Sequence, residues 1–258
     1  LSTVTSMFLD MERMELLRGP QGTLFGKNTV AGVFNIVTAD PVYEWAAKAN
    51  VQFGELDAQR YEGVLNVPII DDVLAMRISG GYTKRDGYVF NTFQEDTDGD
   101  FESKTITAKV GLELGAVTFR FVGGYNDTIY PEGYGYQAIK FPQELSIYAT
   151  AFDPGFEFNV DYQSSKNMEE VTYYETINAS MKADWAINNS DYMLSFVAGY
   201  VETLDTLVVY DGDYSPAHII DFRIEYLGPI FNSFAELKLT TPPKALLNER
   251  FDFVTGAL

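Results

Sequence analysis

The chain has 258 residues, enough for one large domain or two small ones, with 18 Lys and Arg residues against 37 Asp and Glu residues. The net charge of −19 argues against a nucleic-acid partner, because phosphate binding needs a basic stripe that releases counterions. With no cysteine and a single histidine, His218, the sequence also excludes disulfide frameworks, iron–sulfur clusters, cysteine nucleophiles and multi-histidine metal sites.

Hydropathy limits the kind of membrane protein this chain can be. It has no apolar run of about 18 residues, so no transmembrane helix is predicted. The mean hydropathy of −0.09 fits a soluble protein, and it fits a β-barrel equally well, because only alternate residues of a barrel strand meet lipid. Residues 1–4 lack a basic region followed by an apolar one, so no signal peptide is visible, and we expect residue 1 to be an internal start.

The first predicted elements lie within residues 10–41. Met14–Leu17 reads as a short strand that Gly19 and Pro20 end, and Val33–Val37 reads as a second apolar strand. Gly22 and Gly26 between them are turn residues that accept positive φ. The charged run of this segment is by itself equally consistent with a solvated face; it comprises Glu12, Arg13, Glu15 and Arg18.

A nucleotide-binding loop is tempting in the same segment but fails. The stretch from Gly22 to Thr29 resembles a phosphate-binding loop, yet only three residues separate its glycines, and Asn28 replaces the magnesium-binding Ser or Thr.

Beyond about residue 45 the hydrophobic period is two, which predicts strands with one apolar and one polar face. In residues 105–114 every even position is apolar and every odd position is polar or Gly, and similar runs give about nine strands up to the C-terminus. Polar faces that carry basic side chains suit a wet lumen, and they belong to Arg77, Lys109, Arg120 and Lys182.

The lengths of the connections alternate along the chain. Short links are predicted at 71–72, 115–116, 188–189 and 242–243, and long loops near 86–102, 127–170 and 204–222. Such alternation is typical of an up-and-down barrel in the outer membrane, with short periplasmic turns and long extracellular loops.

Aromatic residues near the strand ends suit the girdles of such a barrel, although they could instead cap the core of a soluble sandwich. They are Tyr82, Tyr125, Tyr173, Trp185, Tyr192 and Tyr200.

Residues 10–41 closely resemble the end of the plug domain of TonB-dependent outer-membrane receptors. Ala31 and Phe34 are mild departures from the family pattern. The residues that match it are Glu12, Arg13, Glu15, Leu17, Arg18, Gly19, Pro20, Gln21, Gly22, Leu24, Gly26, Asn28, Gly32, Asn35, Ile36, Val37, Thr38 and Pro41.

The resemblance implies a fold and a domain division. Residues 1–41 would be the C-terminal part of an α+β plug, and residues 42–258 the N-terminal portion of an all-β, antiparallel transmembrane β-barrel of about 22 strands. Because about nine strands cannot close a bacterial single-chain barrel of even number, we expect an internal piece of a longer polypeptide.

The resemblance also implies a function, TonB-dependent uptake of a scarce nutrient across the bacterial outer membrane. The plug would be gated by proton-motive force through the TonB–ExbB–ExbD complex, with no cofactor. Glu15 and Arg18 would make releasable polar contacts between plug and barrel wall. The other plug-motif residues expected at this site are Glu12, Arg13, Gly19, Pro20, Gly22, Gly26, Asn28 and Asn35.

Substrate identity stays open at this point. Ferric siderophores lead because they are the commonest cargo of the family, while haem, cobalamin, oligosaccharides and other metal chelates remain possible. Loop aromatics that could grip such a ligand are Tyr130, Tyr134, Tyr136 and Phe141. The acidic balance disfavours an anionic ligand only if the acidic side chains face the vestibule.

Two other function classes compete with uptake. One is a passive porin or binding barrel without TonB coupling. The other is a soluble calcium-dependent adhesin, suggested by the acidic loop 95–100. This motif fails, because Phe101, the next residue, stands where an EF-hand loop needs glycine. His218 is expected to be an exposed loop residue, and no Ser, His and carboxylate spacing suggests a catalytic triad, so no enzyme and no metal site are predicted.

Overall fold

The computed structural model describes residues 9–19, 31–130, 151, 162–187, 192–211, 221–225, 230–240 and 254–257. Its regular structure consists of strands: β1 Met11–Arg18, β2 Gly32–Thr38, β3 Ala46–Phe53, β4 Gln59–Ile70, β5 Leu74–Arg85, β6 Val89–Asn91, β7 Asp96–Asp98, β8 Phe101–Leu114, β9 Val117–Tyr130, β10 Gln163–Ser164, β11 Val171–Ala186, β12 Met193–Asp211, β13 Asp221–Glu225, β14 Ile230–Thr240 and β15 Val254–Ala257. Among the described residues, there is no helix long and apolar enough to span a membrane.

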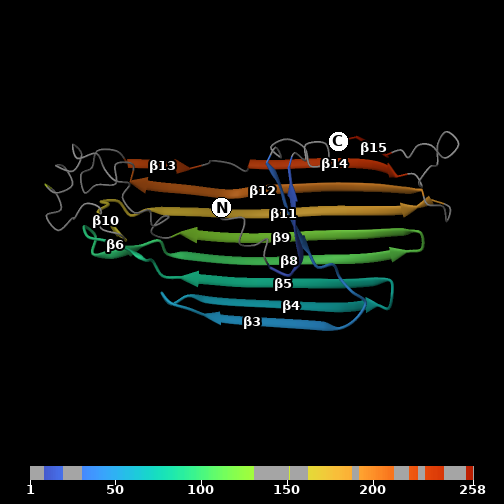
Figure 1. Ribbon diagram of the computed structural model, residues 1–258, viewed down its shortest axis with the longest axis horizontal. Coiled ribbons are helices and arrows are strands. Elements are labelled where there is room, and N and C mark those ends of the chain that lie inside the picture. The colour runs from blue at the N-terminus through green and yellow to red at the C-terminus, as the bar shows by residue number, and fades with distance from the viewer. Residues whose placement is uncertain are drawn as a thin grey trace.

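One large sheet dominates the fold (Figure 1). It has ten strands in the order β15-β14-β12-β11-β9-β8-β5-β4-β3, with β13 paired to β12, and its neighbouring strands are antiparallel. Chain neighbours are therefore sheet neighbours, as in an up-and-down barrel. The predicted fold class, an all-β antiparallel barrel present in part, is confirmed.

The two faces of this sheet differ in polarity, because side chains alternate along each strand and cross-strand partners share a face. On β5 and its neighbours, one face carries Met76, Ile78 and Tyr82, and the other carries Arg77, Ser79 and Thr83. Large apolar side chains such as Ile106 and Phe121 are exposed, whereas most of the fully buried described residues are polar. This inside-out distribution suits a sheet with lipid on one side and a wet lumen on the other.

The links at one end of the sheet are tight, as predicted. β4 turns into β5 at 71–73, where Asp72 has a φ of 55°, and β8 turns into β9 at Gly115, whose φ is 62°. Asp tolerates the left-handed region because its short polar side chain can bond locally. The predicted turns at 188–189 and 242–243 lie outside the described residues.

The predicted long loops need correction at their edges. β12 continues to Asp211, so the loop expected from 204 is wrong over 204–211. The extension is paired on both sides, Val209 with Val171 and with Arg223, so its backbone stays in the sheet although apolar and polar residues no longer alternate there. β9 likewise reaches Tyr130, and the 86–102 segment contains β6 and β7.

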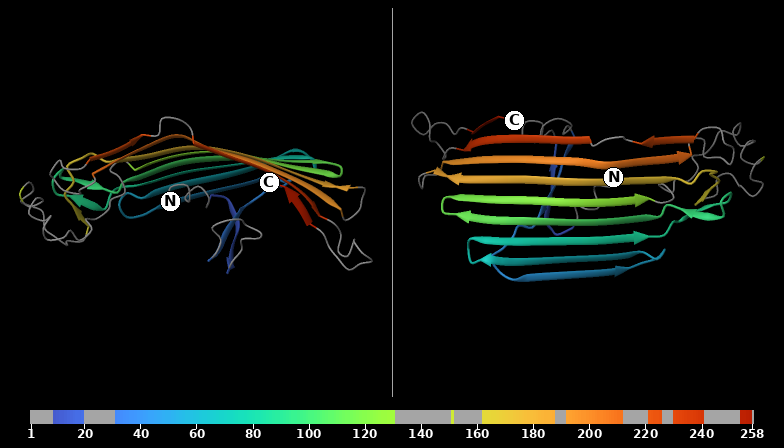
Figure 2. Two further views of the ribbon diagram at one scale, coloured as in Figure 1. Left: turned by 90° about the horizontal axis from the view of Figure 1, so that it is seen from above. Right: turned by 180° about the vertical axis from the view of Figure 1, so that it is seen from behind.

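A separate two-stranded sheet, β1 paired with β2, lies on the concave side of the large sheet (Figure 2, left). Both strands were predicted, and β1 ends at Arg18, followed by Gly19 with a φ of 86°. We call β1 and β2 together the hairpin.

Candidate functional site

The hairpin holds its own charged residues together. Glu15 accepts hydrogen bonds from Arg13 Nε at 2.7 Å and from Asn35 Nδ2 at 2.9 Å, and these two donors lower the pKa of the Glu15 carboxyl. Arg13 also pairs with Glu12 at 3.0 Å, and the hydrogen bond to Glu15 is the main cause of a raised Arg13 pKa. The contacts described for Glu15 thus lie within the hairpin, and its predicted contact with the barrel wall stays a prediction, as does that of Arg18. The predicted residues Pro20, Gly22, Gly26 and Asn28 lie outside the described residues.

Gly32 lies at the end of the hairpin where β1 ends and β2 begins. It pairs with Arg18, and its φ of 145° lies outside the range that other residues adopt easily. A Cβ at this position would come within 2.6 Å of the Leu17 carbonyl oxygen. This explains physically why glycine stands at this position of the motif.

Two cations of the large sheet, Arg77 and Lys109, bind the open end of the hairpin, where β1 begins and β2 ends. We call these contacts the clamp. Arg77 on β5 forms a two-pronged ion pair with Asp10, with both nitrogen–oxygen distances at 2.6 Å. Lys109 on β8 donates to the Thr38 carbonyl at 3.0 Å, the Thr38 hydroxyl at 2.6 Å and the Ala39 carbonyl at 2.8 Å. The Ala39 amide in turn donates to the Asp10 carbonyl at 2.9 Å, so the clamp holds both strands at once.

The clamp residues are direct cross-strand neighbours, since Arg77 lies opposite Lys109. Like charges in that position repel each other. The Asp10 carboxylate and the carbonyls of the hairpin compensate this repulsion, so the wall and the hairpin depend on each other electrostatically. Sequence analysis placed both cations on the lumen face from the alternation but could not indicate their partners.

The connector from β2 to β3 is also fixed by polar side chains. Asn66 of β4, which is fully buried, accepts from the Val42 amide at 3.0 Å and donates to the Val42 and Glu44 carbonyls at 2.6 Å. Tyr43 donates to Glu113 at 3.1 Å, and Glu113 pairs with Arg120 at 2.7 Å. The hairpin therefore leads into the wall through an ordered, hydrogen-bonded segment.

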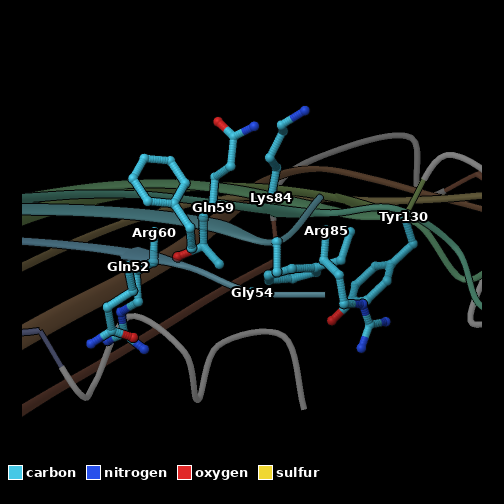
Figure 3. Close-up of a pocket in the computed structure, with 11 residues that line it drawn as sticks. Gln52, Gly54, Gln59, Arg60, Lys84, Arg85 and Tyr130 are labelled. Atoms are coloured by element: carbon cyan, nitrogen blue, oxygen red, sulfur yellow. The ribbon is translucent and has the colours of Figure 1, made fainter. Parts of the chain in front are cut away.

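A pocket of about 500 Å³ opens at the end of the sheet that carries the long connections (Figure 3). Gln52, Arg60, Arg85 and Tyr130 point to one side of the sheet there, and Gln59 and Lys84 point to the other. Tyr130 packs against Phe101 with ring centroids 5.2 Å apart. Of the predicted ligand-facing aromatics, Tyr130 thus lines a pocket, whereas Tyr134, Tyr136 and Phe141 lie outside the described residues.

A buried charge cluster joins the long connections, and sequence analysis did not identify it. Lys166 is 1% exposed and pairs with Asp98 of β7 at 3.0 Å and with Glu170 at 2.6 Å. Glu170 also accepts from the Asp211 amide at 3.0 Å, and burial is the main cause of its raised carboxyl pKa. Asp98 belongs to the acidic segment considered as a calcium loop, but its carboxylate is occupied by the lysine and by Ser164. In the part of the chain that is described, no group of His, Asp or Glu is arranged to hold a metal ion.

The fold and sequence of the chain match known receptors, although no protein-family model matches it. Its structure is similar to the ferric yersiniabactin uptake receptor FyuA from Yersinia pestis, with a TM-score of 0.69 and 19% identity over 96% of this chain and 35% of that one. The chain has the fold of a TonB-dependent outer-membrane receptor.

Relatives found by sequence agree. The iron-regulated outer membrane virulence protein of Vibrio cholerae is 30% identical over 112 residues, which are 40% of this chain and 16% of that protein. The pesticin receptor of Yersinia enterocolitica is 40% identical over 77 residues, 29% of this chain and 11% of the relative. The matched part of this chain thus spans only a small part of the length of these relatives.

Two further predictions are confirmed by these relatives. The predicted localisation in the bacterial outer membrane agrees with their names and with the barrel fold. The prediction that the chain is not an enzyme agrees with relatives that are receptors.

Proposed function

We propose that the chain works in TonB-dependent active uptake of a scarce nutrient across the outer membrane, with a ferric siderophore as the first candidate. Residues 1–41 are the end of the plug in this proposal, and residues 42–258 are the first part of the barrel, with long connections on the outside. The TonB–ExbB–ExbD complex supplies the pull, and proton-motive force supplies the energy.

The observation that carries this proposal is the clamp. Its contacts are ionic and hydrogen-bonded, and Arg77 and Asp10 are 15% and 9% exposed. A plug that must leave the lumen and return needs attachments that water can replace, because apolar packing of the same strength would leave exposed apolar surface in a wet channel. The clamp, made of polar groups at the open end of the hairpin, meets this need.

The pocket of about 500 Å³ at the end of the sheet, which we call the mouth pocket, supports the binding step of the proposal. Its aromatic rings and guanidinium groups can stack on and hydrogen-bond to a chelate before any movement of the hairpin. The chemistry asked of these side chains is binding and orientation alone.

The test is uptake by cells that express the full-length receptor as their only route for a labelled ferric chelate. We expect accumulation that stops when TonB is deleted or when a protonophore collapses the membrane potential. Accumulation that persists without TonB would instead identify a passive porin, and no accumulation of any chelate in a panel of siderophores, haem and cobalamin would reject the uptake proposal.

A further inference from the structure

The charge of this protein is divided between its two faces. The outward-facing strand ends are acidic, since Asp127, Glu175 and Asp205 lie opposite one another on β9, β11 and β12. Along the lumen face of β3, β4, β5, β8, β9 and β11, basic side chains instead outnumber acidic ones. The basic set is Lys48, Arg60, Arg77, Arg85, Lys109, Arg120 and Lys182, and the acidic set is Glu62, Glu113 and Asp184.

Each acidic side chain of the lumen face is already paired. Glu62 is bound by Arg60, Glu113 by Arg120 at 2.7 Å, and Asp184 by Lys182 at 2.8 Å. These contacts neutralise three of the basic side chains, the Asp10 carboxylate neutralises Arg77, and Asp40 lies 4.0 Å from Lys109, which leaves a surplus of two positive charges on this face. The net field along the described wall is therefore positive, although the whole chain carries a charge of −19.

The surplus positive charge reaches the mouth pocket through Arg85. Its guanidinium donates to the Gly99 carbonyl at 2.9 Å and lies 5.0 Å from the Tyr88 ring, and neither contact supplies a negative charge. Its Nε is buried and has no hydrogen-bond partner among the described residues. The pocket thus holds a cation with an unused donor beside the rings of Phe101 and Tyr130.

The positive wall continues inward from the mouth. A second pocket, of about 480 Å³, lies beside β2 and is lined by Lys109, Arg120 and Lys182, together with Asp40 and Asp184. If the hairpin leaves, the clamp cations Arg77 and Lys109 lose Asp10 and the carbonyls that now hold them. A route past the hairpin would then become more positive as it opens.

We propose that this receptor selects net-negative solutes, such as a chelate with surplus carboxylate or phosphate groups, through the positive lumen face from Arg85 inward. This inference rests on the proposed uptake function and specifies the charge class of its substrate. A cleft of one sign concentrates counter-ions, which raises both encounter rate and local concentration about tenfold or more at low salt. Cationic solutes of equal size are disfavoured by the same field, and neutral solutes gain no enrichment from it.

The absence of cysteine in the chain allows a direct measurement of the field. Thr83→Cys places a thiol on the lumen face at the mouth pocket, in the full-length receptor in detergent. Its reaction rates with an anionic and a cationic methanethiosulfonate reagent are compared with those of free mercaptoethanol, and unsubstituted receptor serves as the blank. Gln59→Cys, which points to the other side of the sheet, is the matched control position.

We expect the ratio of anionic to cationic rate at Thr83→Cys to exceed that of the free thiol by about tenfold at low salt, and to fall as salt screens the field. Adding Arg85→Gln should lower this ratio, whereas the neighbouring Lys84→Gln, on the other face, should leave it unchanged. A ratio at or below that of the free thiol overturns the proposal, as does failure of the anionic reagent to reach the thiol. TonB-dependent uptake together with such a ratio would reject the charge class and leave the uptake function standing.

Discussion

The clamp makes a quantitative prediction for the substitution Asp10→Asn. The side chain keeps its shape and one acceptor, but it loses its charge and one of the two 2.6 Å bonds to Arg77. Because both partners are largely buried and the amide keeps one acceptor, we expect docking of the hairpin to weaken by about 2 kcal/mol, the value for a lost charge-assisted hydrogen bond and less than that for a broken buried pair. That is a rise of about 30-fold in the equilibrium constant for release.

Hydrogen–deuterium exchange of the amides of β1 and β2 in the full-length receptor measures this release. Exchange in the substituted protein should be faster by that factor wherever it proceeds through hairpin opening. Glu12→Gln is the control, because it makes the same chemical change two residues away in a pair that is about half exposed, and it should leave exchange unaltered. Equal exchange in the two variants would refute the view that the clamp holds the hairpin.

Three further predictions concern other contacts. Lys166→Met should leave Asp98 and Glu170 buried without a cation and destabilise β6 and β7 by about 3 kcal/mol, seen as faster amide exchange there, while Lys104→Met, in an exposed pair, should not. Because burial raises the pKa of Glu170, the folded segment holds a proton more readily than the unfolded chain. Its stability should therefore increase as pH falls from about 7 to about 5, and Glu170→Gln should abolish that trend in exchange measured across the range. Gly32→Ala should loosen the β1–β2 end of the hairpin, because the new Cβ meets the Leu17 carbonyl at 2.6 Å; unchanged exchange of Arg18 would contradict this.

The strands of the large sheet could be predicted because lipid and lumen impose opposite demands on alternate residues. Met76 and Ile78 alternate with Arg77 and Ser79, which indicates a hydrophobic period of two. The structure places the two sets on opposite faces of the sheet. The extension of β12 to Asp211 could not be predicted, because apolar and polar residues do not alternate over 204–211. Pairing with β11 and β13 maintains that strand, and pairing is a property of three segments together.

The candidate site was only half accessible from the sequence. Glu15 and Asn35 were identified by resemblance, and they contact each other in the structure. Asp10 and Arg77 lie 67 positions apart, and no local pattern links them. The Lys166 cluster could not be predicted for the same reason. A single lysine in a long connection is expected to be solvated, and only the structure shows that β6, β7 and the end of β12 enclose this one.

The position of Arg77 opposite Lys109 bears on how this protein is assembled. If β5 and β8 pair in an empty lumen, two neighbouring cations face each other with no anion to balance them. If the hairpin is already present, the same pairing step gains an ion pair and three hydrogen bonds. The order of events is thereby biased: pairing of β5 with β8 is more favourable once the hairpin is in place, so the hairpin acts as a template for these two strands.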